Sequence, residues 1–234
     1  MKTVNDILMI LRIAFDFAEE EYNITMPKIS FLRETKKEAR VLSNIEQQIL
    51  IQFLVTDMDI YKFGVLFALY TGVRVGELCA LQWEDITDDY VQINKTMQRL
   101  RIENGKTQII IGEPKSNSSR RIIPIPKILL PYIDAFRQKQ GYVLFTNQNH
   151  YAEPRIVQMR FQKMAKSCDI QNVNFHALRH TFATRCIEAG VDVKSLSEIL
   201  GHSDVKTTLN RYVHSSFELK QISMEKLTFP EINI

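Results

Sequence analysis

Hydrophobic residues recur every three to four positions over both the first third and the last half of the chain, and this pattern changes after Trp83. Such spacing is typical of helices that bury one apolar face. It predicts helices over residues 5–21, about 43–55, about 60–70, about 75–81, about 127–139, 154–167, 176–189, 193–200 and 204–213.

Several of these helices carry start or stop signals. Ser43 and Glu46 have the spacing of a capping box, which predicts the beginning of the second helix. Gly72 should end the third helix, and Gly190 and Gly201 stand where helix C-caps belong.

The middle of the chain has the pattern of strands and turns. Tyr90–Leu100, Thr107–Gly112 and Arg120–Pro126 are predicted as three short strands, with turns at Asn104-Gly105 and at Pro114–Ser119. The predicted fold is therefore α+β and mostly helical, with a small three-stranded antiparallel sheet inserted between helices.

Charge changes this picture locally. The whole chain carries a net charge of only +3, but residues 93–127 hold eight basic and two acidic side chains, a local excess of +6. A basic stripe on a near-neutral protein fits contact with phosphate at one place, and an ordinary solvated hairpin is the alternative. The expected DNA-contacting residues of the stripe are Lys95, Arg99, Arg120 and Arg121.

The remaining composition excludes other classes of protein. Cys79, Cys168 and Cys186 are widely spaced and odd in number, which favours reduced thiols and a cytoplasmic location over a disulfide framework. Charged residues interrupt the N-terminal apolar stretch, so no signal peptide is expected, and no segment has the length of a membrane span.

Four short motifs then point to a chemistry. They are Thr71–Leu78 with its arginine and glutamate, Pro114–Ser116 around Lys115, His176–Thr181, and Leu200–His202 followed ten residues later by Tyr212. With these four motifs in this order, residues 41–215 resemble the catalytic domain of the tyrosine recombinase (phage integrase) family. The segment Thr207–His214 is most similar to integrases of conjugative transposons.

The resemblance implies the tyrosine recombinase catalytic-domain fold and a site-specific enzyme that cleaves and rejoins DNA through a covalent 3′-phosphotyrosine. It assigns the catalytic roles to Arg74, Lys115, His176, Arg179, His202 and Tyr212, with Tyr212 as the nucleophile. Glu77 and His180 are expected to support the site: Glu77 follows Arg74 by three residues, and His180 is read as a buried helper of its helix.

Elementary chemistry agrees with these roles. Two guanidiniums can each donate paired hydrogen bonds to a charged phosphorus centre. A tyrosine hydroxyl has a pKa of about 10, so forming its phenolate at neutral pH costs roughly 4 kcal/mol unless nearby cations and a base assist. Lys115, on a turn, is the natural donor of the proton that the leaving 5′ oxygen needs.

Other interpretations stay open at this point. His176 and His180 have a spacing able to bind zinc, but Ala177 replaces the glutamate of the zinc-protease motif, so neither a metal nor a cofactor is expected. Arg74 and Glu77 could be a routine helical ion pair. The alternative functions are an inactive or truncated DNA-binding remnant of an integrase and a type IB topoisomerase-like strand transferase.

The resemblance also implies the domain organisation and partners. Residues 1–40 are expected to be a remnant of the core-binding domain, its last helix plus a linker; residues 41–214 are the catalytic domain, and residues 215–234 a C-terminal helix and tail. Double-stranded DNA is the expected partner, together with other recombinase protomers contacted through the amphipathic segment 217–227. No membrane partner is expected.

Overall fold

The computed structural model describes residues 2–33, 39–102, 105–113, 117–139, 141–146, 150–212 and 224. The chain divides into one unit over residues 1–38 and a second over residues 39–234. In the first unit, helix α1 (Lys2–Tyr22) is followed by an extended segment. The Asn5 side chain fastens that segment to α1, because it donates to the carbonyl oxygen of Leu32 and accepts from its amide, each at 2.9 Å.

The second unit begins with three helices, and the predicted signals Ser43 and Gly72 begin the first and end the second of them. Ser43 caps α2 (Asn44–Val55) in a complete capping box with Glu46. Asp59 caps α3 (Ile60–Thr71), which is buried along most of its length. Gly72 closes α3 with a φ of 67°, a left-handed conformation that glycine adopts without strain, and the chain turns directly into α4 (Val75–Ala80).

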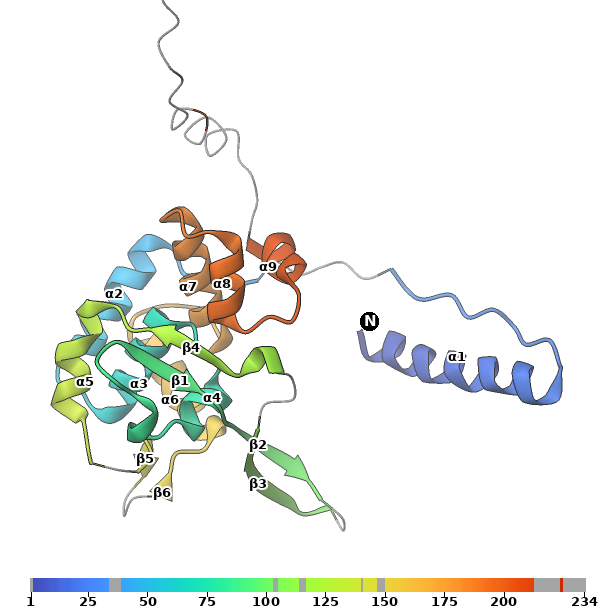
Figure 1. Ribbon diagram of the computed structural model, residues 1–234, viewed down its shortest axis with the longest axis horizontal. Helices are drawn as coiled ribbons and strands as arrows, with labels where there is room; N and C mark the ends of the chain where they lie inside the picture. The colour runs from blue at the N-terminus through green and yellow to red at the C-terminus, as the bar shows by residue number, and fades with distance from the viewer. Residues whose placement is uncertain are drawn as a thin grey trace, which may run out of the picture. The chain divides into compact units, whose positions relative to one another are not determined.

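The strands form separate two-stranded ladders, which corrects the expectation of one three-stranded sheet. The predicted first strand breaks at residues 94–95 into β1 (Tyr90–Ile93) and β2 (Thr96–Arg101). β1 pairs antiparallel with β4 (Arg121–Pro124), and β2 pairs antiparallel with β3 (Thr107–Gly112). Val91 and Ile93 bury one face of β1, whereas β2 becomes exposed toward its end. Figure 1 shows the β2–β3 hairpin extending away from the helices.

The remaining elements lie between these strands and after β4. They are the short turns η1 (Trp83–Asp85), η3 (Asn117–Ser119) and η4 (Lys127–Leu129), the ladder of β5 (Phe145–Thr146) with β6 (His150–Tyr151), and the helices α5 (Leu130–Phe136), α6 (Pro154–Ser167), α7 (His176–Glu188), α8 (Val193–Leu200) and α9 (Val205–Tyr212). The small β5–β6 ladder was not predicted. The predicted helix over 217–227 lies outside the described residues, apart from Met224.

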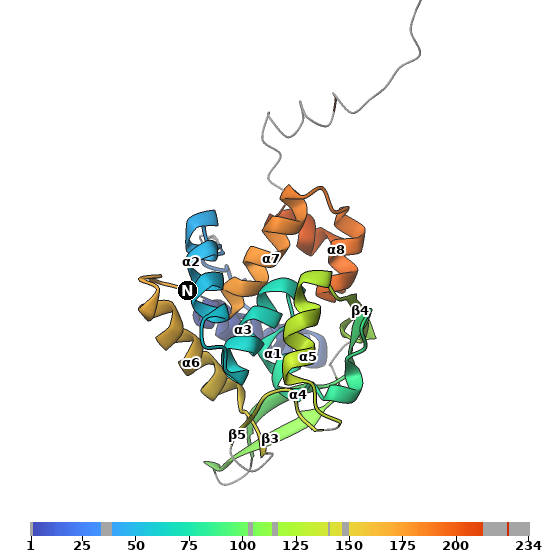
Figure 2. The same ribbon diagram turned by 90° about the vertical axis from the view of Figure 1, so that its left-hand side faces the viewer.

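Helix α3 is the centre of the second unit. It packs against α2, α4, α6 and α7, and Figure 2 shows it between α2 and α6 on one side and α5 on the other. α7, α8 and α9 contact one another and bring residues 176–212 against the C-terminal end of α3. In the described part of the chain, no helix is both long enough and apolar enough to cross a membrane.

Candidate active site

A buried carboxylate, Glu77, organises the first part of the site. Glu77 lies in the first turn of α4, where it accepts from the Arg74 amide at 2.9 Å and from the Arg74 guanidinium at 2.7 Å. Arg121 of β4 donates to both of its carboxylate oxygens, at 3.0 and 2.8 Å. Burial raises the pKa of Glu77, but the hydrogen bonds and charges of Arg121 and Arg74 outweigh it and lower the pKa to about 2.

Arg121 is the clearest correction to the sequence-based expectations. Its side chain is only 5% exposed, whereas the basic stripe in the sequence suggested a surface position. Besides Glu77 it donates to the carbonyl oxygen of Ile199 at 2.5 Å and to that of Ser119 at 3.1 Å. Arg121 therefore ties β4 to the end of α8. In β4 Arg121 shares the inward face with Ile123, which the sequence does not reveal because isoleucines stand on both faces of this strand.

The second expected arginine, Arg179 of α7, is fully buried. It donates to the carbonyl oxygens of Gly72, at 2.8 Å, and of Leu200. These two carbonyls belong to the C-terminal ends of α3 and α8, where the helix dipole favours a cation. Burial and the neighbouring charges of Arg74 and Arg121 lower the Arg179 pKa to about 9. Its positive charge is thus held at a place where an additional anion would be stabilised.

Arg74 lies at the surface end of this arrangement. It precedes α4 and is about a third exposed, and its guanidinium also reaches the carbonyl oxygen of Gly201 at 3.3 Å. Arg74 and Arg179 are therefore brought to the same place, the ends of α3 and α8. We refer to Arg74, Arg121 and Arg179 with Glu77 as the arginine cluster.

Tyr212 and His180 form the opposite side of the site. The Tyr212 hydroxyl lies 2.7 Å from Nδ1 of His180, and both residues are 7% exposed. The Tyr212 ring belongs to a small apolar cluster with Ala183, Leu196 and Leu200. Leu200 is also the residue whose carbonyl oxygen accepts from Arg179, so the Tyr212 ring lies near the arginine cluster.

The other two histidines of the predicted site lie on α7 and just after α8. His176 is exposed one turn before His180 on α7, and the two rings meet edge to face with centroids 4.5 Å apart. His202 follows the cap of α8, and its Nδ1 lies 2.8 Å from the hydroxyl of the buried Thr208. Thr208 was not singled out from the sequence. It holds the His202 ring in one orientation.

The remaining predicted positions are Lys115 and three basic residues of the stripe. Lys115 lies outside the described residues. Lys95 contacts the side-chain oxygen of Gln82 at 2.6 Å, while the exposed Arg99 and Arg120 form ion pairs with Glu153 and Glu113. No group of three or more histidine, cysteine or acidic side chains in the described part of the chain is arranged to hold a metal. The cysteines named above are all free thiols.

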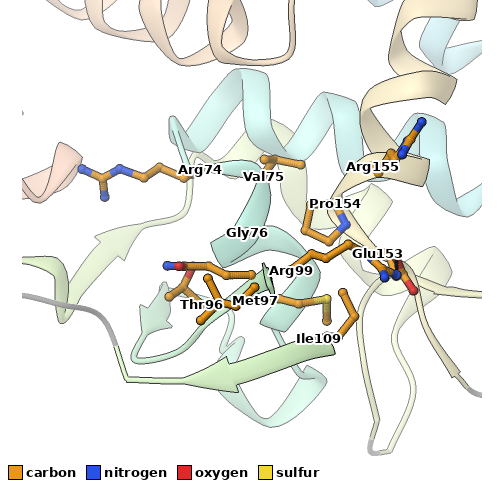
Figure 3. Close-up of a pocket in the computed structure, with 12 residues that line it drawn as sticks. Arg74, Val75, Gly76, Thr96, Met97, Arg99, Ile109, Glu153, Pro154 and Arg155 are labelled. Carbon is orange, nitrogen blue, oxygen red and sulfur yellow. Dashed lines mark hydrogen bonds and ion pairs between the residues drawn. The ribbon is translucent and has the colours of Figure 1, made fainter. Parts of the chain in front are cut away.

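A cavity of about 420 Å³ lies next to Arg74 and is not lined by the other predicted catalytic residues that the structure describes. It lies between the β2–β3 hairpin and the beginnings of α4 and α6, and the ion pair of Arg99 with Glu153 spans it. Figure 3 shows the guanidinium of Arg74 pointing away from Arg99 and Arg155. Of the four residues of the arginine cluster, Arg74 is the one that lines the cavity.

Comparisons with known proteins show relatives over much of the chain. A tyrosine recombinase XerC-like protein of Caldanaerobacter subterraneus subsp. tengcongensis is 32% identical over 187 residues, which are 69% of this chain and 47% of that protein. The ICEBs1 integrase of Bacillus subtilis is 26% identical over 91% of this chain and 61% of its own length. The chain therefore spans less than two thirds of either relative.

Solved structures share the fold. A structure of the Tn1549 transposon integrase in complex with a circular intermediate DNA superimposes with a TM-score of 0.80 at 23% identity, covering 97% of this chain and 79% of that one. The XerA recombinase gives a TM-score of 0.61 at 23% identity, over 83% and 68% of the two chains.

The family model described as the phage integrase family matches residues 40–218. This match covers most of the chain and includes all of the predicted catalytic positions. The chain belongs to the phage integrase family and carries the catalytic domain of a tyrosine recombinase.

Proposed function

We propose that this chain cleaves and rejoins DNA strands at a specific site through a 3′-phosphotyrosine at Tyr212, as part of the integrase of a mobile element. The observation that carries this proposal is that the Tyr212 ring packs in one cluster with Leu200, whose carbonyl oxygen accepts from the buried guanidinium of Arg179. Tyr212 and Arg179 come from different helices, and their chemistry is that of a nucleophile near a phosphate-binding cation.

The charge of the arginine cluster suits the reaction. Three guanidiniums and one carboxylate give it a net charge of 3 − 1 = +2. Attack on a phosphodiester builds negative charge on the non-bridging oxygens, and preorganised cations in a desolvated place stabilise that charge. Arg74, the exposed member, would meet the phosphate first, while Arg179 would act from beneath.

Two further groups would handle the leaving 5′ oxygen. Lys115 is proposed as its proton donor, and His202 as a donor to the phosphate or to the leaving oxygen. The hydrogen bond to Thr208 supports His202 in this role, because it restricts the ring to one orientation.

Double-stranded DNA is the proposed substrate. Arg99 and Arg120 are 42% and 52% exposed in their ion pairs, and such surface pairs contribute at most about 1 kcal/mol. Phosphate oxygens could therefore replace their acidic partners at little cost. With Lys95, these residues remain the proposed DNA contacts of the stripe.

The two ends of the chain also have proposed roles. Helix α1 exposes large apolar side chains, including Ile7, Ile10 and Phe17, which supports the proposal that residues 1–40 belong with a core-binding domain. The proposed contact with other protomers concerns residues that, apart from Met224, lie outside those described.

The decisive experiment traps the covalent intermediate. Nicked duplexes from a random-sequence pool are incubated with the chain, and those that become covalently bound are recovered and sequenced. We expect a defined sequence to be enriched and the adduct to disappear with Tyr212→Phe, which keeps the ring and removes the hydroxyl. Tyr90→Phe, a change on the exposed edge of β1, is the matched control and should leave the adduct in place.

The outcomes separate the alternatives. No adduct with any duplex would show an inactive remnant. An adduct without sequence preference, together with relaxation of supercoiled plasmid, would indicate a topoisomerase-like enzyme. A full-strength adduct from Tyr212→Phe would refute the assignment of the nucleophile.

A further inference from the structure

We infer that His180 is the catalytic base that takes the proton from Tyr212 during strand cleavage and returns it during rejoining. This inference rests on the proposed function and gives His180 a role in the chemistry itself. From the sequence alone, His180 was expected only to support its helix.

The contact between the two side chains is suited to proton transfer. A separation of 2.7 Å between Nδ1 and the hydroxyl oxygen is that of a well-formed hydrogen bond. Both groups are buried, so bulk water has little access to the phenolic proton. A base already in contact with the hydroxyl is what the tyrosine needs in order to attack.

The surroundings hold both partners in place. The Tyr212 ring is packed in the apolar cluster at the junction of α7, α8 and α9. The His180 ring lies against the Tyr212 ring on one side, with centroids 5.6 Å apart, and against the His176 ring on the other. The hydrogen bond is therefore built into the fold and does not depend on a loop.

His176 occupies a different kind of place. It is exposed at the first position of α7, where DNA phosphate approaching from solvent would meet it. His180 is buried behind it and in contact with the nucleophile. The geometry thus divides the work, with His176 contacting the phosphate and His180 contacting Tyr212.

The proton balance is complete without a further reactant. Neutral His180, with its hydrogen on Nε2, accepts the Tyr212 proton at Nδ1 while the bond from the phenolic oxygen to phosphorus forms. The bond from phosphorus to the 5′ oxygen breaks, and the 5′ oxygen takes a proton from the general acid. In rejoining, the 5′ hydroxyl attacks phosphorus and gives its proton back to the group that acted as the general acid, while the phenolate leaves and the His180 imidazolium returns the proton to Tyr212. Arg179 stabilises the phenolate in both directions.

His180→Asn is the variant that tests this role. Asparagine places an amide oxygen near the position of Nδ1, so it can still accept a hydrogen bond, but it takes up no proton at neutral pH. On the duplexes enriched by covalent capture, we expect the rate of adduct formation to fall roughly 100-fold or more, as is typical when a general base is lost. A near-normal rate would mean that His180 only positions Tyr212, and it would overturn the inference.

A second measurement separates loss of the base from structural damage. Incorporation of a difluorotyrosine at position 212 makes the phenol more acidic and reduces its need for a base. The defect of His180→Asn should then shrink at least tenfold, whereas the defect of His202→Asn should not. An unchanged His180→Asn defect with the acidic phenol would overturn the inference.

Two controls keep the result interpretable. Trp83, the only tryptophan, is 3% exposed and reports by fluorescence whether the second unit of each variant is folded. If His180→Asn does not fold, the test uses the otherwise unchanged chain with a series of fluorotyrosines at position 212. A resident base should make the rate of adduct formation only weakly dependent on the acidity of the phenol. A steep dependence would refute the role of His180 as the base. If the wild-type chain forms no adduct that depends on Tyr212, the proposed function itself fails.

Discussion

Replacing Glu77 by glutamine should destabilise the protein strongly, because this carboxylate neutralises a buried cluster of arginines. Glutamine has nearly the same shape and keeps one hydrogen-bond acceptor, so the change removes charge with little loss of packing. Arg121, which is 5% exposed, would keep its charge without the ion pair to Glu77. The cluster would carry +3 in place of +2.

The magnitude follows from the pKa of the carboxyl group. A fall from the ordinary value of 4.5 to about 2 on folding corresponds to about 3 kcal/mol of stability at neutral pH. Because Glu77 is only 3% exposed, solvent screens its interaction with the arginines only weakly. An independent expectation for removing one partner of a buried ion pair is about 3–5 kcal/mol. Because the folded-state pKa is lowered, the stabilisation is present above pH 4.5 and is lost as the pH falls toward 2.

Urea unfolding followed by Trp83 fluorescence measures this effect. With a slope of about 2–3 kcal/mol per molar urea, the midpoint of Glu77→Gln should lie about 1 M below that of the wild-type chain at pH 7. The difference should narrow as the pH is lowered below 4.5. Glu188→Gln is the matched control: Glu188 is 52% exposed in its pair with Arg185, so its loss should cost less than about 0.5 kcal/mol.

Two results would refute this reasoning about Glu77. One is a destabilisation of less than about 1 kcal/mol at pH 7. The other is a difference between the two proteins that stays constant from pH 7 to pH 3, which would mean that shape or packing, and not the charge of the carboxylate, is responsible.

Four other predictions concern the chemistry and the fold. Lys115→Ala should slow adduct formation on ordinary DNA and recover on a substrate with a bridging 5′ sulfur, which leaves without a proton. Adduct formation should survive a strong chelator, since the arginine cluster supplies the positive charge that a metal would provide. Arg120→Ala should reduce the log–log salt dependence of DNA binding by nearly one, whereas Arg121→Ala should lower the urea midpoint and leave that slope unchanged. Gly72→Ala should lower the free energy of unfolding, measured with urea, by roughly 2–4 kcal/mol, because φ is 67° and the new methyl carbon would lie 2.4 Å from Phe182.

Local signals in the sequence were sufficient where a single turn or cap decides the structure. The capping box of Ser43 and Glu46 begins α2 as predicted, and Gly72 and Gly201 end α3 and α8 in the left-handed conformation. Such features depend on residues a few positions apart, so the chain pattern contains them. The mostly helical fold with small antiparallel sheets followed from the same periodicities.

The break between β1 and β2 could not be read from the same pattern. Asn94 and Lys95, at which the predicted strand breaks, are poor strand formers, but these two residues do not specify how the backbone turns there. The bend arises because β1 packs on the core while the end of β2 leaves it. Arg121 was misplaced for a related reason: a basic residue in a basic stripe suggests a surface, and only the packing of β4 shows that it faces inward.

The sequence by itself determined which chemical groups this protein has and on which helices and turns they lie. The tertiary structure decided which of them meet. Arg121 reaches Glu77 across 44 positions, and Tyr212 reaches His180 across 32. Contacts over such separations depend on how whole helices pack, and a buried charge takes whichever partner that packing brings within hydrogen-bonding distance. The roles proposed for Glu77, Arg121 and His180 therefore follow from the folded arrangement of α3, α4, α7, α8 and α9.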